Sequence, residues 1–170
     1  MKKLFLLTLV TGLFLSLSSS AQQDKSKRPS PPAKVSKTLG SGAEISVDYS
    51  RPSLKGRSLS ALAPVGKVWR TGANEATVFE TSKDVKIEGK TLTAGKYGLY
   101  TIPGDQEWTI IFNKTWKQWG TVYKESEDAL RVNVKAGKSS ENTEVFTFDI
   151  ADNGNVSMIW ADTKVVFKVR

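Results

Sequence analysis

Residues 146–160 have the sequence FTFDIADNGNVSMIW, and this stretch decides the fold class. Apolar side chains alternate with polar ones in residues 146–150 and again in residues 156–160. Such alternation indicates strands with one buried face, because successive side chains of a strand point to opposite sides. Asn153-Gly154 lies between the two runs and favours a hairpin turn, since both residues adopt positive φ readily. The stretch therefore predicts two antiparallel strands joined by a tight turn.

The same pattern extends through the rest of the chain. Period-two alternation recurs in residues 45–49, 130–134 and 165–169. Residues 96–102 and 108–112 instead carry apolar side chains on both faces, which is typical of strands covered on both sides. We expect the three C-terminal strands to form a meander.

The strand content determines the predicted architecture. No segment has sustained helical periodicity, and short helical turns are predicted only at residues 58–63 and 116–123. About nine or ten strands with short loops predict an all-β, antiparallel β-sandwich, with a β-barrel as the alternative. Residues 33–170 contain no linker-like stretch and are close to the usual length of one domain, so we expect a single domain.

The N-terminal residues predict export. Residues 1–21 combine two lysines, an apolar run and a small-residue end, which is the pattern of a signal peptide. We therefore expect a periplasmic or extracellular protein, with no transmembrane segment once the signal is cleaved. Residues 22–32 are rich in lysine and proline and predict an extended leader that tethers the domain.

Charge and residue types limit the classes of partner and reaction. The formal net charge is +8, and loss of residues 1–21, which hold two lysines and no acids, would leave +6. Such an excess of lysine can attract anionic polysaccharide or a membrane surface, or it can be solvated charge, and export argues against nucleic acid. The chain has no histidine and no cysteine, which excludes disulfides, thiol chemistry and Ser-His-Asp catalysis. A carboxylate pair, a Lys or Tyr base, or an oxygen-only metal site remains for catalysis. The acidic stretch at residues 149–160 fails as a calcium loop because its third and twelfth positions are Ala151 and Trp160, so we predict no metal and no cofactor.

The stretch KVWRTGANEA at residues 67–76 is the strongest candidate for a binding loop. Arg70 offers a planar fork of donors for carboxylate, phosphate or sulfate, and Asn74 and Glu75 can bind sugar hydroxyls. The alternative is structural: Arg70 would pair with Glu75, Asn74 would cap a turn, and Trp69 would belong to the core.

Two further motifs are candidates for ligand contact. Arg51 and Arg57 flank Gly56 and could form an anion-binding rim or remain a solvated loop. Whether this loop converges with the Trp69–Glu75 loop is left open. Trp116 and Trp119 would lie on one face of a helical turn, either exposed to grip a sugar ring or buried as a cap on the sandwich.

Four stretches resemble one protein family. They are YSRPSLKGR (49–57), GKVWRTGANEAT (66–77), LTAGKYGLYTIPG (92–104) and EWTIIFNK (107–114). From about residue 33 to the C-terminus, the chain resembles the domain of unknown function 2911 family of secreted bacterial proteins. The resemblance implies an exported protein and brings no reaction, ligand or catalytic residue with it.

Three hypotheses for function follow. The first is a non-catalytic binding module for a hydroxyl-rich or anionic small ligand, a glycan or an envelope protein. The second is a hydrolase or lyase that uses carboxylates such as Glu75 and Asp48, which requires an acid of raised pKa in a cleft. The third is a structural or adhesion module with its tryptophans in a flat apolar patch.

Overall fold

The computed structural model describes residues 24–170, so the predicted signal peptide at residues 1–21 lies outside the described residues. The all-β prediction is confirmed, and nine strands are present in the described part of the chain. The strands are β1 (Pro32–Thr38), β2 (Glu44–Ser50), β3 (Thr77–Thr81), β4 (Val85–Ile87), β5 (Lys90–Leu92), β6 (Gly95–Ile102), β7 (Glu107–Asn113), β8 (Asp128–Ile150) and β9 (Asn155–Lys168). One α-helical turn, α1 (Leu59–Leu62), and two 3-10 turns, η1 (Lys25–Lys27) and η2 (Glu125–Glu127), complete the described elements.

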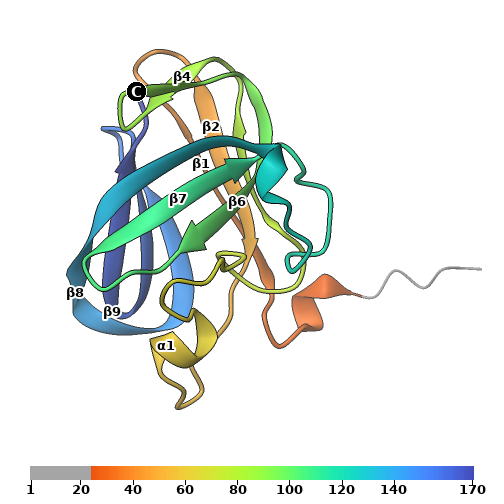
Figure 1. The fold of residues 1–170 in the computed structure, drawn as a ribbon, viewed down its shortest axis with the longest axis vertical. Coiled ribbons are helices and arrows are strands. Elements are labelled where there is room, and N and C mark those ends of the chain that lie inside the picture. The colour runs from red at the N-terminus through yellow and green to blue at the C-terminus, as the bar shows by residue number, and fades with distance from the viewer. Residues whose placement is uncertain (1–23) are drawn as a thin grey trace, which may run out of the picture.

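A single antiparallel sheet makes both layers of the molecule. Its strand order is β1-β2-β3-β6-β7-β8-β9, and β4 and β5 form a separate hairpin. The first part of β8 pairs with β7, and its later part pairs with β9. Because β8 is 23 residues long and belongs to both pairings, the sheet curls over onto itself (Figure 1). The two layers are therefore parts of one curled sheet.

Side-chain and backbone hydrogen bonds close the seam between the two ends of the curled sheet. The backbone N–H of Phe148 on β8 donates to the hydroxyl of Tyr49 on β2 at 3.0 Å. Directly after β2, the N–H of Leu54 donates to the carbonyl oxygen of Glu144 at 3.0 Å. The fold thus lies between the predicted sandwich and the alternative barrel, with these contacts where a closed barrel would have a continuous ladder.

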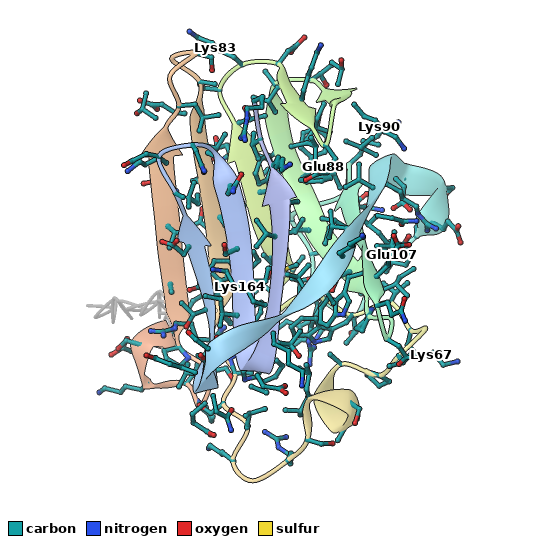
Figure 2. The ribbon with its side chains drawn as sticks, turned by 90° about the vertical axis from the view of Figure 1, so that its left-hand side faces the viewer. Lys67, Lys83, Glu88, Lys90, Glu107 and Lys164 are labelled. Carbon is teal, nitrogen blue, oxygen red and sulfur yellow. The ribbon has the colours of Figure 1, made fainter. Side chains whose placement is uncertain are left out.

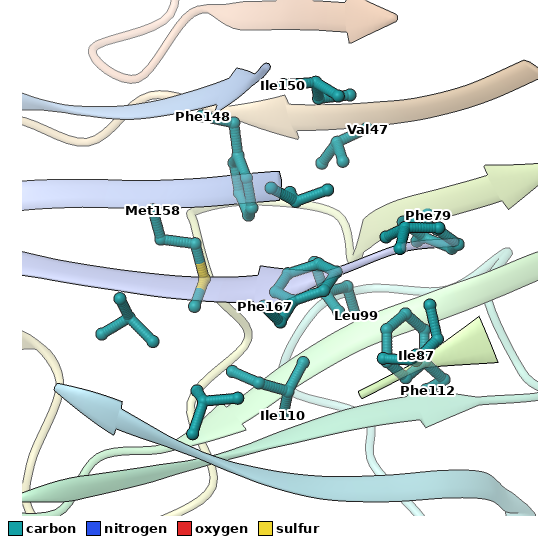
Figure 3. Packing of buried hydrophobic residues seen from close by; sticks show 14 of the residues in the cluster. Val47, Phe79, Ile87, Leu99, Ile110, Phe112, Phe148, Ile150, Met158 and Phe167 are labelled. Carbon is teal, nitrogen blue, oxygen red and sulfur yellow. The ribbon is translucent and has the colours of Figure 1, made fainter. Parts of the chain in front are cut away.

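The core fills the space between the two layers. Figure 3 shows inward side chains from β2, β3, β6, β7, β8 and β9 meeting there. Phe79, Phe112 and Phe167 pack edge to face, with ring centroids 5.1–6.3 Å apart. Labelled charged residues such as Lys83, Glu88 and Lys164 lie on the outside (Figure 2). The alternation that predicted half-buried strands therefore has its cause in this shared core.

The predicted C-terminal meander is wrong in one respect. Residues 156–160 and 165–169 belong mainly to one strand, β9, and residues 146–150 form the end of β8. The inward positions change from even numbers (Met158, Trp160) to odd numbers (Val165, Phe167), and the change occurs at Ala161, whose φ is +52°. One residue of left-handed conformation shifts the alternation, so a single strand has the pattern of two.

The two predicted helical turns have different outcomes. Helix α1 confirms the first, and the Ser58 hydroxyl caps it by accepting from the N–H of Ala61. Residues 116–123 form no helix. Their backbone groups pair instead with residues 74–76 of the candidate binding loop. The N–H of Ala76 donates to Gln118 O, and the N–H of Gly120 donates to Asn74 O, both at 3.0 Å. A helix would need these same groups for its own bonds.

The loop at residues 114–127 covers the outer face of the central strands. Tyr100 on β6 and Ile111 on β7 point outward yet are fully buried, and Tyr123 of the loop packs against them. This confirms the prediction that the central strands are covered on both sides. Among residues 24–170, no helix is both long and apolar enough to cross a bilayer.

The conformation of Ala161 predicts a stabilising substitution. Ala161→Gly should raise the free energy of unfolding by about 0.5–1 kcal/mol, because the left-handed region costs an L-residue about 1–2 kcal/mol and the chain entropy of glycine offsets only part of that. Ala136→Gly on β8, where φ is negative, should lower it by a similar amount. Urea unfolding of both variants checks this, and a loss of stability in Ala161→Gly would contradict the left-handed strain assigned to Ala161.

Candidate functional site

The candidate binding loop, residues 67–76, begins with a residue that pairs with strand β6 of the central sheet. The N–H of Trp69 donates to Thr101 O at 2.7 Å, and the N–H of Thr101 donates back to Trp69 O at 2.9 Å. Trp69 consequently lies beside β6 with its indole in the core, 7% exposed. Successive residues of an extended segment point to opposite faces, so Arg70 lies on the outer side of the sheet. The core prediction for Trp69 is confirmed.

Glu75 pairs with the N-terminal leader and has no ion pair with Arg70. Its carboxylate lies 3.0 Å from Lys25 Nζ and 2.8 Å from Arg28 Nη1. Partial burial raises the pKa of Glu75, but hydrogen bonds and charge from Lys25 and Arg28 outweigh it and lower the pKa from 4.5 to about 2. The predicted Arg70–Glu75 pair is therefore wrong, and Glu75 anchors the chain that precedes β1.

Asn74 makes the second contact with the leader. Its side-chain amide donates to the carbonyl oxygen of Ser30 at 3.0 Å and to the hydroxyl of Ser50 at 3.2 Å. Asn74 has φ +61°, a conformation that asparagine tolerates, and this directs its amide toward residue 30. Residues 25–30, expected to be part of an extended tether, contain the 3-10 turn Lys25–Lys27 and contact the domain through Lys25, Arg28 and Ser30.

The loops that carry Arg70 and Trp119 pack against each other. A Cβ atom added at Gly120 would lie 2.6 Å from Arg70 Cδ and 2.9 Å from Asn74 O, so the glycine lets the two loops pack in direct contact. Trp119 precedes this glycine, bridges to Glu75 through its backbone, and is 49% exposed. Among residues 24–170, the Arg70 guanidinium makes no hydrogen bond or ion pair of standard geometry. Both side chains are therefore partly accessible to solvent.

Trp116 lies apart from this pair. Its ring is partly buried, with Lys96 Nζ 5.2 Å from the ring centroid. The backbone of Trp116 packs over Gly98 of β6, where a Cβ would lie 3.6 Å from Trp116 Cα. The helical face expected for Trp116 and Trp119 does not form, because the loop between them is not a helix.

The two arginines of the upstream loop have partners within the protein. Arg51 donates to the carbonyl oxygen of Phe146 at 3.4 Å and to the hydroxyl of Thr147 at 3.1 Å. Arg57 donates to carbonyl oxygens of residues 53 and 54 at 3.0 and 2.9 Å. Arg51 thus supports the seam with β8, and Arg57 closes its own loop. Neither guanidinium joins the surface of Arg70 and Trp119.

Comparison with known proteins identifies the domain. A family model described as "Protein of unknown function (DUF2911)" matches residues 30–169. The chain belongs to the DUF2911 family. Neither the curated proteins nor the solved structures contain a match. The match includes Arg70, Asn74, Glu75 and Trp119, whereas Lys25 and Arg28, which hold Glu75, precede it.

A polar network holds the covering loop of this DUF2911 domain. Asp128 accepts from Tyr123 at 2.7 Å, from Arg131 at 2.7 Å and from Asn113 at 2.8 Å. Burial raises the pKa of Tyr123 to about 12, and Asp128 adds to the rise. No sequence signal indicated this network, because its residues come from β7, β8 and the loop. It fixes the loop that presents Trp119.

The described residues of the DUF2911 chain contain no evident metal centre. No three carboxylate, histidine or cysteine side chains of residues 24–170 lie close enough together to hold an ion. The acidic stretch at residues 149–160 is the β8–β9 hairpin, with Gly154 at φ +75° as its turn signal predicted.

The leader contact predicts a pH-dependent stability. Glu75→Gln should lower the free energy of unfolding at pH 7 by about 1 kcal/mol, as two solvent-screened ion pairs are lost. The folded-state pKa is depressed, so the contribution of Glu75 is full above pH 4.5 and disappears as the pH falls toward 2. The difference in melting temperature between wild type and variant should shrink over that interval. Glu141→Gln, an exposed β8 change, is the control, and parallel pH profiles for wild type and Glu75→Gln would contradict the linkage.

Proposed function

We propose that the chain is an exported, non-catalytic binding module that holds an acidic saccharide on the surface of Arg70 and Trp119. The signal-peptide pattern of residues 1–21 supports export. The observation that carries the proposal is the pairing of a guanidinium that has no acceptor among residues 24–170 with a half-exposed indole on adjoining loops.

The chemistry of the two side chains defines the ligand class. A guanidinium binds a carboxylate or sulfate through two parallel hydrogen bonds. A flat indole face takes the C–H surface of a pyranose ring, as aromatic side chains do at other binding sites. A sugar ring that carries an acid group satisfies both contacts. The formal net charge of +6 that remains after loss of residues 1–21 further favours approach of an anionic ligand.

The catalytic alternative has less support at this surface. A hydrolase or lyase that used Glu75 as its acid would need a carboxyl group that is protonated near neutral pH. Lys25 and Arg28 instead hold the pKa of Glu75 at about 2. Asp48, the other carboxylate considered, lies on β2 and pairs with Lys34 at 3.0 Å. Neither carboxylate is arranged as a general acid.

A protein partner is the second candidate function. Val122 of the covering loop is 48% exposed, close in sequence to Trp119, and Val68 beside Arg70 is 40% exposed. An aromatic anchor with apolar neighbours and an arginine has the composition of a protein-binding hot spot. Adhesion through this surface would use Trp119 without requiring an acid group on the partner.

Calorimetric titration with an oligomer of uronic acids, and with the neutral oligomer of the same linkage, separates these possibilities. The acidic oligomer should bind, and Arg70→Gln and Trp119→Ala should each weaken its affinity at least about tenfold, or 1.4 kcal/mol. Lys164→Gln, which removes one exposed charge from β9, should leave the affinity within about twofold. Equal binding of both oligomers, or unchanged affinity in Arg70→Gln, would refute recognition of the acid group. Binding of neither oligomer would favour the protein partner.

A further inference from the structure

The two ends of the curled sheet are closed in different ways. The β4–β5 hairpin covers one end, and its apolar side chains at positions 85, 87 and 92 are all buried. The hairpin also shares backbone hydrogen bonds with the end of the chain, from Lys86 to Arg170 O and from Glu88 to Lys168 O. Helix α1 lies at the opposite end, the lower one in Figure 1. The chain segment that contains α1 is held to the sheet less firmly than the β4–β5 hairpin is.

The segment at residues 56–65 has the construction of a flap. Its backbone hydrogen bonds are local, and among residues 24–170 none joins it to another strand. Ala63 is buried, Leu59 and Leu62 are partly buried, and the remaining residues of the segment are exposed. Gly56 and Gly66 bound it, with φ +75° and +72°, conformations that only glycine adopts freely. A segment with few buried contacts and glycines at both ends opens at low free-energy cost.

Four aromatic side chains lie beneath the flap. Trp69 stacks on Trp160, with centroids 5.6 Å apart and an interplanar angle of 16°. Trp108 and Phe146 meet Trp69 edge to face at 6.3 and 5.1 Å. A small void remains among these rings, and Leu59 of α1 lines it. Leu59 therefore lies as a plug over this void of about 10 Å³, and the void with the rings around it is called the aromatic chamber.

A groove leads outward from the plug. It has a volume of about 450 Å³ and shares Leu59, Trp108 and Thr163 with the void. Its rim carries exposed polar groups from α1, the β6–β7 loop, β8 and β9, namely Ser60, Asp105, Lys138 and Asp162. An apolar chamber with a few polar groups at its entrance is the usual composition of a small-molecule site, and barrel mouths are a usual place for one.

We propose that residues 56–65 open as a flap and that the mouth binds a small molecule with a flat apolar ring and an uncharged or cationic polar group. The ring takes the place of Leu59 against Trp69, Trp108 and Trp160, where the aromatic faces and edges that the open flap uncovers favour another flat ring. Two carboxylates and one ammonium at the rim favour a hydroxyl or amine over an acid. This site is separate from the Arg70 surface, because Trp69 and Arg70 point to opposite faces of one segment.

The fluorescent probe N-phenyl-1-naphthylamine, a neutral aromatic amine, tests the site in the exported chain. Wild type should bind it with energy transfer from the tryptophans, and Leu59→Ala should bind at least tenfold more tightly, because the plug no longer competes. Leu62→Ala is the matched control: Leu62 lies on the same helix and packs on the core but does not line the void, so its affinity should stay near that of wild type.

A second variant keeps the test decisive if Leu59→Ala does not fold. Thr163→Trp places a large ring at the shared rim of void and groove, where the side chain is partly exposed, and should abolish probe binding while the chain stays folded. Binding that survives in Thr163→Trp, or that rises equally in Leu59→Ala and Leu62→Ala, would overturn the proposal. So would absence of binding in both wild type and a folded Leu59→Ala. Arg70→Gln should leave probe binding unchanged, which separates this result from the saccharide test.

Discussion

The passage of β8 through both layers is the constraint on which the rest of the structure depends. Since this strand pairs first with β7 and then with β9, the two layers cannot separate as independent sheets. Their inner faces share one core, and side-chain contacts such as Tyr49 to Phe148 close the remaining seam. A sheet that curls in this way has two open ends and an outer face, and each of these needs a separate cover.

The covers place the candidate binding surfaces. The loop at residues 114–127 shields Tyr100 and Ile111 on the outer face, and its backbone pairing with residues 74–76 brings the loop that carries Trp119 against Arg70. At one end of the sheet, α1 closes the aromatic mouth with Leu59. Both surfaces therefore arise where irregular chain has to protect apolar side chains of the sheet, which is why they combine aromatic rings with polar loop residues.

Local patterns predicted most of the strands, and non-local pairing decided where they failed. Alternation and the Asn153-Gly154 turn predicted the β8–β9 hairpin, since strand periodicity and positive φ are properties of short segments. The three-residue spacing of Trp116 and Trp119 suggested a helix, but residues 74–76 took up the backbone groups that a helix requires. Glu75 had a nearby partner in Arg70, yet its observed partners lie 50 and 47 residues upstream, at Lys25 and Arg28.

The sequence by itself determined the all-β class, the strand faces, the exclusion of histidine and cysteine chemistry, and membership of the DUF2911 family through its motifs. These follow from residue type and short-range order, which any fold of the chain must respect. Only the tertiary structure decided that the sheet is single and curled, that Arg51 and Arg57 are occupied by protein acceptors, and that Arg70 meets the Trp119 loop. Those outcomes depend on which backbone and side-chain groups, far apart in the sequence, form hydrogen bonds with one another. The spacing of residues along the chain does not determine those partners.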